Sequence, residues 1–138
     1  MTNEQNKALE HRFFEEQDRL KGALPEKLCA SNYTFILGDD PAVDFTGHQH
    51  LAAMFYAAFP DLRQTIEDAV AEDDRVVVLL KAQGTHTGPF MHIPATGKPI
   101  AMSGMAILHI VDGKVAQMRE VFDQLSMLQQ LGVIPPMG

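Results

Sequence analysis

The chain has 138 residues, of which 46% are hydrophobic and 21% are charged, a balance that excludes a disordered protein and suits one domain with a single core. Its net charge is −7 and its 11 lysine and arginine residues are scattered, which argues against binding to nucleic acid or to an anionic membrane. The N-terminus has no secretory pattern, and no apolar run approaches the roughly 20 residues of a membrane span. We therefore expect a soluble, cytoplasmic protein.

The first third of the chain carries one long helical pattern. Leu9, Phe13 and Leu20 recur on one face among charged residues and predict an amphipathic helix over residues 3–20. Pro25 suits the first turn of a second helix. The elements predicted here after the first helix are a short helix at 25–30, a strand at 32–37 and a turn at 38–41.

The apolar segment HQHLAAMFYAAF predicts a buried helix over residues 48–59, which Pro60 ends. The side chains at helical spacing on its expected core face are Leu51, Met54, Phe55, Ala58 and Phe59. His48 and His50 diverge at an i, i+2 spacing and have no carboxylate at ligand spacing nearby, so we expect no metal ion.

The second half of the chain predicts mostly antiparallel strands. They are expected at residues 64–71, 75–87, 100–111 and 114–123, with a glycine- and proline-rich loop at 88–99 and a helical tail at 124–132. Asp112-Gly113 is a strong hairpin signal between the last two strands. Helices that precede strands indicate an α+β domain over residues 1–138, with roughly four to six strands.

The turn at Asp112-Gly113 sets the expected register of the last hairpin. The expected pairs are Val111 with Lys114, Arg119 with Ala106, and Asp123 with Met102. Arg119 and Asp123 then share one face of the sheet, and Glu120 lies on the other. A bulge in the last strand would bring Glu120 onto the face of Asp123, and the sequence leaves this open. Because both faces are largely apolar, one is expected to cover the helices and the other a second subunit.

Several motifs together resemble the SnoaL-like polyketide cyclase (ester cyclase) family, within the nuclear transport factor 2-like superfamily. The matching pieces are AAFPDLRQTIED at 57–68, GTHTGPFMHIPATGK at 84–98, HIVDGK at 109–114 and D-x-L-x-M-L-x-Q-L-G at 123–132. The resemblance implies a cone-shaped α+β domain, with N-terminal helices on a strongly curved antiparallel sheet and a deep apolar pocket.

The resemblance also implies a chemistry. Cyclases of this family close a ring by intramolecular aldol condensation without metal or cofactor, and an aspartate on the last strand moves the proton. That aspartate falls on Glu120 here, and Asp123 matches another acidic position of the family. The histidine partner on the preceding strand falls on Ala106 and is missing, which argues against authentic cyclase activity.

A carboxylate in an apolar cone is expected to have a raised pKa, which suits general acid–base catalysis near neutral pH. Glu120 and Asp123 are the candidate catalytic residues, and Arg119 could bind a substrate oxygen. The alternatives are an ion pair of Arg119 with either acid, a helix N-cap at Asp123, and an outward, solvated Glu120.

Further candidates would line the pocket if the family fold holds. They are His86, Tyr33, Phe35, Phe55, Phe59 and Met102. The aromatic residues are equally well explained as core packing, and His86 could instead tie a loop to its strand.

Two hypotheses follow for the function. The leading one is a cofactor-free enzyme that performs proton transfer, aldol cyclisation or isomerisation on an apolar, carbonyl-bearing small molecule. Its rival is a non-catalytic small-molecule binding module in which the carboxylates are structural. A homodimer through the outer sheet face is expected in either case.

Overall fold

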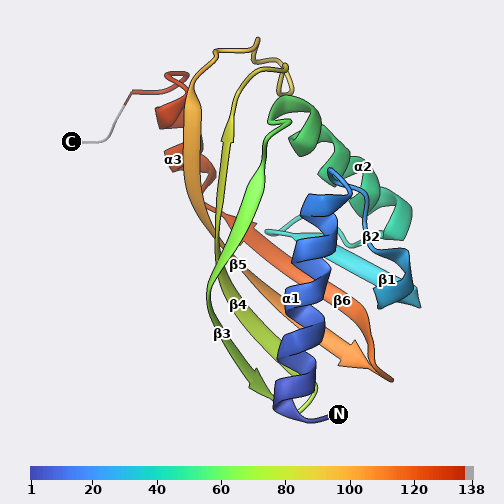
Figure 1. The fold of residues 1–138 in the computed structure, drawn as a ribbon. Helices are drawn as coiled ribbons and strands as arrows, with labels where there is room; N and C mark the ends of the chain where they lie inside the picture. Colours follow the sequence, from blue (N-terminus) through green and yellow to red (C-terminus); the bar gives the residue numbers. More distant parts are fainter. Residues whose placement is uncertain (136–138) are drawn as a thin grey trace.

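The structure, a computed structural model, describes residues 1–135. Its elements in chain order are α1 (Asn3–Arg19), the 3₁₀ helix η1 (Glu26–Leu28), β1 (Cys29–Leu37), β2 (Val43–Asp44), α2 (Phe45–Ala58), β3 (Arg63–Glu72), β4 (Arg75–Thr85), β5 (Pro99–Val111), β6 (Lys114–Phe122) and α3 (Gln124–Gln130). Figure 1 shows α1 and α2 against a strongly curved sheet. Helix α3 lies beside the first residues of β5. The predicted α+β class is confirmed.

The strands form one sheet in the order β2-β1-β6-β5-β4-β3. β1 runs parallel to β6, and the other neighbouring strands are antiparallel. The sheet is therefore mixed rather than wholly antiparallel. β1 and β6 are joined through all the elements between them, so no tight turn obliges them to run in opposite directions.

The final hairpin carries a β-bulge that corrects the predicted register. Val111 pairs with Lys114 as expected, but the pairing shifts by one residue at Ala116. Beyond this bulge Arg119 lies opposite Ile107, and Glu120 lies opposite Ala106. A one-residue shift exchanges the faces of a strand. Glu120 therefore points to the inner face, beneath the helices, and the pairings predicted for Arg119 and Asp123 are wrong.

The predicted core face of α2 is confirmed at Ala58 and Phe59, which are buried, but it is wrong at Met54. Its N-cap is Asp44, whose carboxylate accepts a hydrogen bond from the Gly47 amide at 2.9 Å. The buried side carries His48, Ala52 and Tyr56, whereas Met54 is 43% exposed. Because the helix is apolar nearly all round, hydrophobic spacing could not select its inner face. The two polar side chains on this side each make a hydrogen bond inside the molecule, His48 with Tyr33 and Tyr56 with Asp18.

Two hydrophobic clusters fill the space between the helices and the inner face of the sheet. The first packs α1 residues such as Phe13 against Val78 and Leu108 of the sheet. The second joins the end of α2 to α3, through residues that include Phe59 and Met127. Side chains from both clusters reach the region around α2 and β6, where the candidate site lies.

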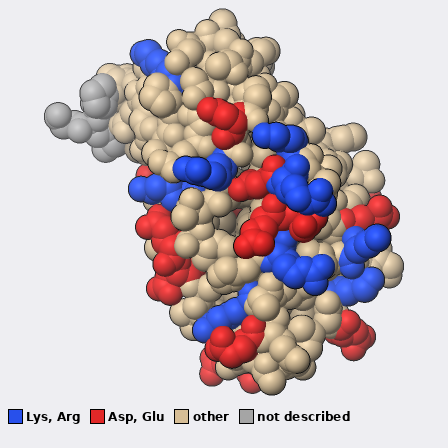
Figure 2. All heavy atoms as spheres, viewed as in Figure 1, with Lys and Arg blue, Asp and Glu red and all other residues tan. Residues whose placement is uncertain are grey.

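The surface mixes charges of both signs. On the face that Figure 2 shows, lysine and arginine side chains alternate with aspartate and glutamate. Apolar side chains of β5 and β6 remain partly exposed on the outer face of the sheet: Met105 at 47%, Ile107 at 44% and Val121 at 50%. Within residues 1–135, no helix is both long and apolar enough to cross a membrane.

Candidate active site

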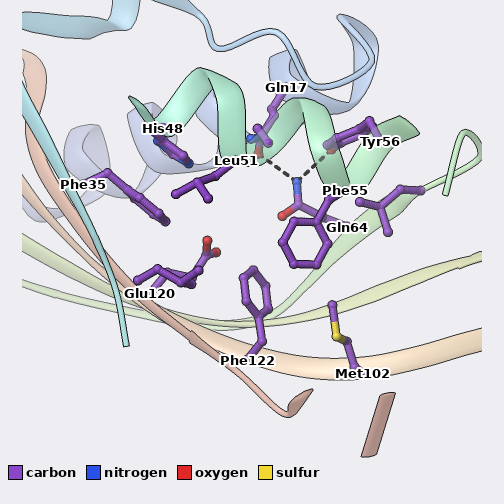
Figure 3. A pocket seen from close by; sticks show the side chains of 13 residues that line it. Gln17, Phe35, His48, Leu51, Phe55, Tyr56, Gln64, Met102, Glu120 and Phe122 are labelled. Carbon is purple, nitrogen blue, oxygen red and sulfur yellow. Dashed lines mark hydrogen bonds between the residues drawn. The ribbon is translucent and has the colours of Figure 1, made fainter. Parts of the chain in front are cut away.

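A small pocket lies between α2 and the inner face of the sheet (Figure 3). Its volume is about 40 Å³, which is room for a few water molecules. The side chains that line it are Gln17, Phe35, Leu37, His48, Leu51, Ala52, Phe55, Tyr56, Leu62, Gln64, Met102, Glu120 and Phe122. Most are apolar, so the few polar groups among them decide what the pocket can bind or react with.

Glu120 supplies the only carboxylate among the lining residues, and its side chain points into the pocket from β6. It is 6% exposed, and its Oε2 atom has no hydrogen-bond partner among the described residues. Burial raises the pKa of this carboxyl to about 8, because a charged carboxylate loses its hydration in an apolar site. Ala106, directly opposite on β5, adds no polar group beside it.

His48 forms a second polar element of the pocket wall. Its Nδ1 lies 2.8 Å from the Tyr33 hydroxyl, and its ring stacks on Phe35 with centroids 3.6 Å apart. Burial lowers the pKa of His48 to about 3, so the imidazole is neutral at physiological pH. Tyr33 is buried and this is its hydroxyl's one hydrogen bond within residues 1–135. If the hydroxyl only accepted from Nδ1–H, its own buried proton would have no acceptor. We therefore assign the hydroxyl as the donor to Nδ1 and place the His48 proton on Nε2.

A polar network closes the opposite wall. Asp18 accepts a hydrogen bond from the Tyr56 hydroxyl at 2.5 Å and one from the backbone amide of Gln64 at 2.8 Å. The Gln64 side-chain amide donates to Gln17 Oε1 at 3.0 Å and to Asp18 Oδ1 at 3.2 Å. Asp18 Oδ1 is also the oxygen that accepts from Tyr56. The network joins α1, α2 and β3, so it holds this wall in place.

Aromatic rings border the pocket between these two walls. Phe55 lies 5.7 Å from Phe122 and 5.1 Å from Phe90, measured between ring centroids. Phe55 and Phe122 are only half-buried. A ligand larger than a few waters would therefore have to displace these rings.

The structure brings together some of the site residues predicted from the sequence. Phe35, Phe55, Met102 and Glu120 line the pocket. Tyr33 lies behind the wall and acts on the pocket only through its hydrogen bond with His48. The remaining four, Phe59, His86, Arg119 and Asp123, do not line it.

Asp123 and Arg119 lie on the outside of the molecule. Asp123 is exposed and is the N-cap of α3, where its carboxylate accepts a hydrogen bond from the Ser126 amide at 3.0 Å. The side chain of Arg119 is 53% exposed and lies 4.0 Å from Asp39. The proposed ion pair of Arg119 with Asp123 or Glu120 is absent from the described residues, because the bulge turns Arg119 to the outer face of the sheet.

His86 fixes the loop after β4. Its Nδ1 lies 2.9 Å from the Thr96 hydroxyl, and its backbone exchanges hydrogen bonds with Lys98 and Gly97. Its ring packs beside Phe59, in the second hydrophobic cluster. Within the described part of the chain, no group of three or more histidine, cysteine, aspartate or glutamate side chains could hold a metal ion.

Sequence reasoning missed four polar residues of the site: Gln17, His48, Tyr56 and Gln64. The spacing of His48 and His50 in the sequence raises only the question of a metal ligand. Gln17 stands on the same helical face as Phe13, and this spacing was the available signal. Gln64 and Tyr56 gave no local signal, since their role depends on contacts between distant segments.

Fold and pocket together define an α+β domain of helices on a curved sheet, with a small and mostly apolar pocket between them into which one carboxyl points. A model of the SnoaL-like polyketide cyclase family matches residues 11–131. The chain belongs to this family. No curated protein gave a match in sequence.

Solved structures agree with this assignment. AclR, a candidate hydroxylase from Streptomyces galilaeus, is 27% identical with a TM-score of 0.89, over 99% of this chain and 87% of that one. IdmH, a candidate polyketide cyclase from Streptomyces antibioticus, is 27% identical with a TM-score of 0.83, over 93% and 99% of the two chains. A candidate polyketide cyclase from Bacillus cereus is 27% identical with a TM-score of 0.77, over 94% and 82%.

Proposed function

We propose that this protein is an acid–base enzyme that moves the proton on the carbon next to a carbonyl group, in an apolar small molecule. The observation that carries the proposal is Glu120, a buried carboxyl with an unpartnered oxygen that points into the pocket. Membership of a family named for polyketide cyclases supports a substrate with carbonyl groups. AclR is described as a hydroxylase and IdmH as a polyketide cyclase. Because these two similar proteins carry different reaction names, we confine the proposal to proton transfer.

The proposed reaction begins with Glu120 in its ionised form. The carboxylate takes a proton from the α-carbon, and the electron pair of the broken C–H bond moves to the carbonyl oxygen to form an enolate. In an aldol cyclisation the enolate carbon attacks a second carbonyl of the same molecule, and Glu120 returns its proton to the new alkoxide. In an isomerisation the proton returns to another carbon. A pKa of about 8 suits both directions of transfer near neutral pH.

The polar donors of the pocket can assist this transfer. His48, with its proton on Nε2, is a neutral donor on the same side of the pocket as Glu120 (Figure 3). A hydrogen bond to the carbonyl oxygen would stabilise the charge that develops on it. Tyr33 acts as a positioning residue because it fixes the tautomer of His48.

The rival proposal is a binding module in which Glu120 carries no reaction. Ala106 favours this rival, because the residue opposite the carboxyl provides no partner for it. Binding alone would need the carbonyl to accept a hydrogen bond from the protonated Glu120, with no proton leaving carbon.

Exchange of ketone protons for deuterium separates these two proposals. We expect the protein to accelerate exchange of the methyl protons of acetophenone in D₂O, followed by NMR. The rate constant should rise with pH and level off above about pH 8, because the ionised carboxylate is the base. Acceleration that is absent at every pH, while acetophenone still binds, would support the binding module and contradict the enzyme.

Two further features stay proposals. We propose a homodimer through the outer sheet face, where Met105, Ile107 and Val121 leave apolar surface exposed. A location in the cytoplasm rests on the sequence alone.

A further inference from the structure

We infer that the ligand carries a hydroxyl group on the side away from its reacting carbonyl, and that Gln64 Oε1 accepts the hydrogen bond from this hydroxyl. The inference rests on the proposed function for the position of the carbonyl, at Glu120. It adds a specificity-determining residue and narrows the substrate class to hydroxylated ketones.

The first step is the orientation of the Gln64 amide. Its nitrogen lies 3.2 Å from Asp18 Oδ1 and 3.0 Å from Gln17 Oε1. An ionised carboxylate can only accept hydrogen bonds, so the atom that faces Asp18 must be the nitrogen. The carbonyl oxygen of the amide must then face away from Asp18.

The second step is the rigidity of the carboxylate that imposes this orientation. Asp18 Oδ1 accepts from Tyr56, and Oδ2 accepts from the backbone amide of Gln64. Both oxygens are therefore held, one by α2 and the other by β3. A turned amide would bring its oxygen against Asp18 and lose a charge-assisted hydrogen bond.

The third step is the direction of the amide oxygen. Figure 3 shows the Gln64 oxygen directed into the open space of the pocket, beside Phe55 and across from the Glu120 carboxyl. No donor within residues 1–135 makes a hydrogen bond to Gln64 Oε1. The oxygen is thus a free acceptor on the pocket wall. Gln64 is half-buried and its Oε1 is not among the buried unpaired atoms, so a donor group of a ligand would replace water at this oxygen.

The pocket therefore has two unlike ends. Glu120, when protonated, and His48 Nε2 offer donors to a carbonyl, whereas Gln64 offers an acceptor to a donor group on the ligand. The apolar side chains of Leu51 and Phe55 lie between these ends. A neutral hydroxyl fits the acceptor better than an ammonium group, because burial of a charge in a small apolar pocket is costly.

Single-ring ketones are small probes that can carry both a carbonyl and a hydroxyl group. They are larger than the pocket volume of about 40 Å³, so their binding requires the half-buried rings of Phe55 and Phe122 to move aside. The series is acetophenone, meta- and para-hydroxyacetophenone, and the methyl ether of each hydroxylated ketone, titrated by NMR at about pH 6. At this pH the phenol is protonated, and so is the carboxyl of Glu120, because burial raises its pKa to about 8. At least one hydroxylated probe should bind about 10-fold more tightly than its methyl ether and than acetophenone. Equal affinities across the series, or no binding of either hydroxylated probe, would overturn the inference.

Variants then assign the preference to Gln64. Gln64→Met keeps the length of the side chain and removes the acceptor, so the roughly 10-fold advantage of the hydroxylated probe should vanish. The matched control is Gln83→Met, at an exposed position of β4, which should keep the advantage. A preference that survives in folded Gln64→Met would contradict the inference.

If Gln64→Met does not fold, a second variant tests whether the Gln64 amide oxygen accepts the ligand hydroxyl. Asp18→Asn retains the shape of the network but lets the Gln64 amide turn, because an asparagine amide can donate as well as accept. The ratio of the affinity for the hydroxylated probe to the affinity for acetophenone should fall in this variant. An unchanged preference for the hydroxylated probe in Asp18→Asn would contradict the inference that Asp18 fixes the orientation of the Gln64 amide.

The deuterium exchange experiment keeps the two proposals distinguishable. A wild-type protein that exchanges ketone protons but shows no preference for the hydroxylated probes would reject only the role of Gln64. A hydroxyl preference in a protein that exchanges no ketone protons would reject the acid–base proposal and retain the binding inference.

Discussion

Replacement of Glu120 by glutamine is expected to slow the exchange of α-protons on a bound ketone by about 10²- to 10⁴-fold, the usual contribution of a positioned general base. Glutamine has nearly the same shape and cannot take the proton. Because Glu120 is buried in a mostly apolar pocket and the neutral amide resembles its protonated form, binding of acetophenone should change little. The measurement is the NMR exchange rate beside the dissociation constant of the same ketone.

Two matched variants make this result specific. Glu120→Asp keeps a carboxyl group but shortens the side chain by one methylene, so this variant should retain part of the exchange activity. Asp123→Asn keeps a good N-cap for α3 and should exchange ketone protons at the wild-type rate. Full activity in folded Glu120→Gln would reject Glu120 as the base.

The free energy of unfolding is expected to fall by about 3 to 6 kcal/mol as pH rises from about 5 to 9, since each pKa unit is worth about 1.4 kcal/mol. Burial raises the pKa of Glu120 from 4.5 to about 8 and that of Glu10 from 4.5 to about 7. Both side chains therefore hold protons in the folded state at a pH where the unfolded chain has released them. A group with a raised folded pKa stabilises at low pH, and this stability is lost as pH rises through the folded pKa.

Urea unfolding at each end of this pH range measures the effect. Glu10→Gln and Glu120→Gln should each flatten the dependence, and the double variant should nearly remove it. The contribution of Glu10 to the pH dependence also involves His11, because His11 Nδ1 lies 2.7 Å from the Glu10 carboxyl. Glu67→Gln, at an exposed position of β3, is the surface control. A wild-type stability that stays constant or rises over this range would contradict burial of the two acids.

Local signals in the sequence predicted much of the fold. The Asp112-Gly113 turn and the strands on either side of it are present as expected. The single-residue bulge at Ala116 is not marked by any glycine or proline, so the register beyond it could not be predicted. This one residue decides that Glu120, rather than Arg119, faces inward. The family resemblance indicates Glu120 independently of the register.

The walls of the pocket were less predictable than its carboxylate. His48 and Gln64 became functional candidates only through partners far away in the chain, Tyr33 and Asp18. Neither contact follows from spacing within one element. Asp123, by contrast, had a local alternative as the N-cap of a following helix, and this is the position it occupies.

A pH titration of the Glu120 carboxyl carbon by ¹³C NMR tests the central claim most directly, with the signal assigned by its loss in Glu120→Gln. We predict a midpoint at about pH 8, because the carboxyl is buried in an apolar pocket without a cationic partner among the described residues. A midpoint near the ordinary value of 4.5 would mean that Glu120 is solvated or paired, and would contradict its role as the acid–base residue.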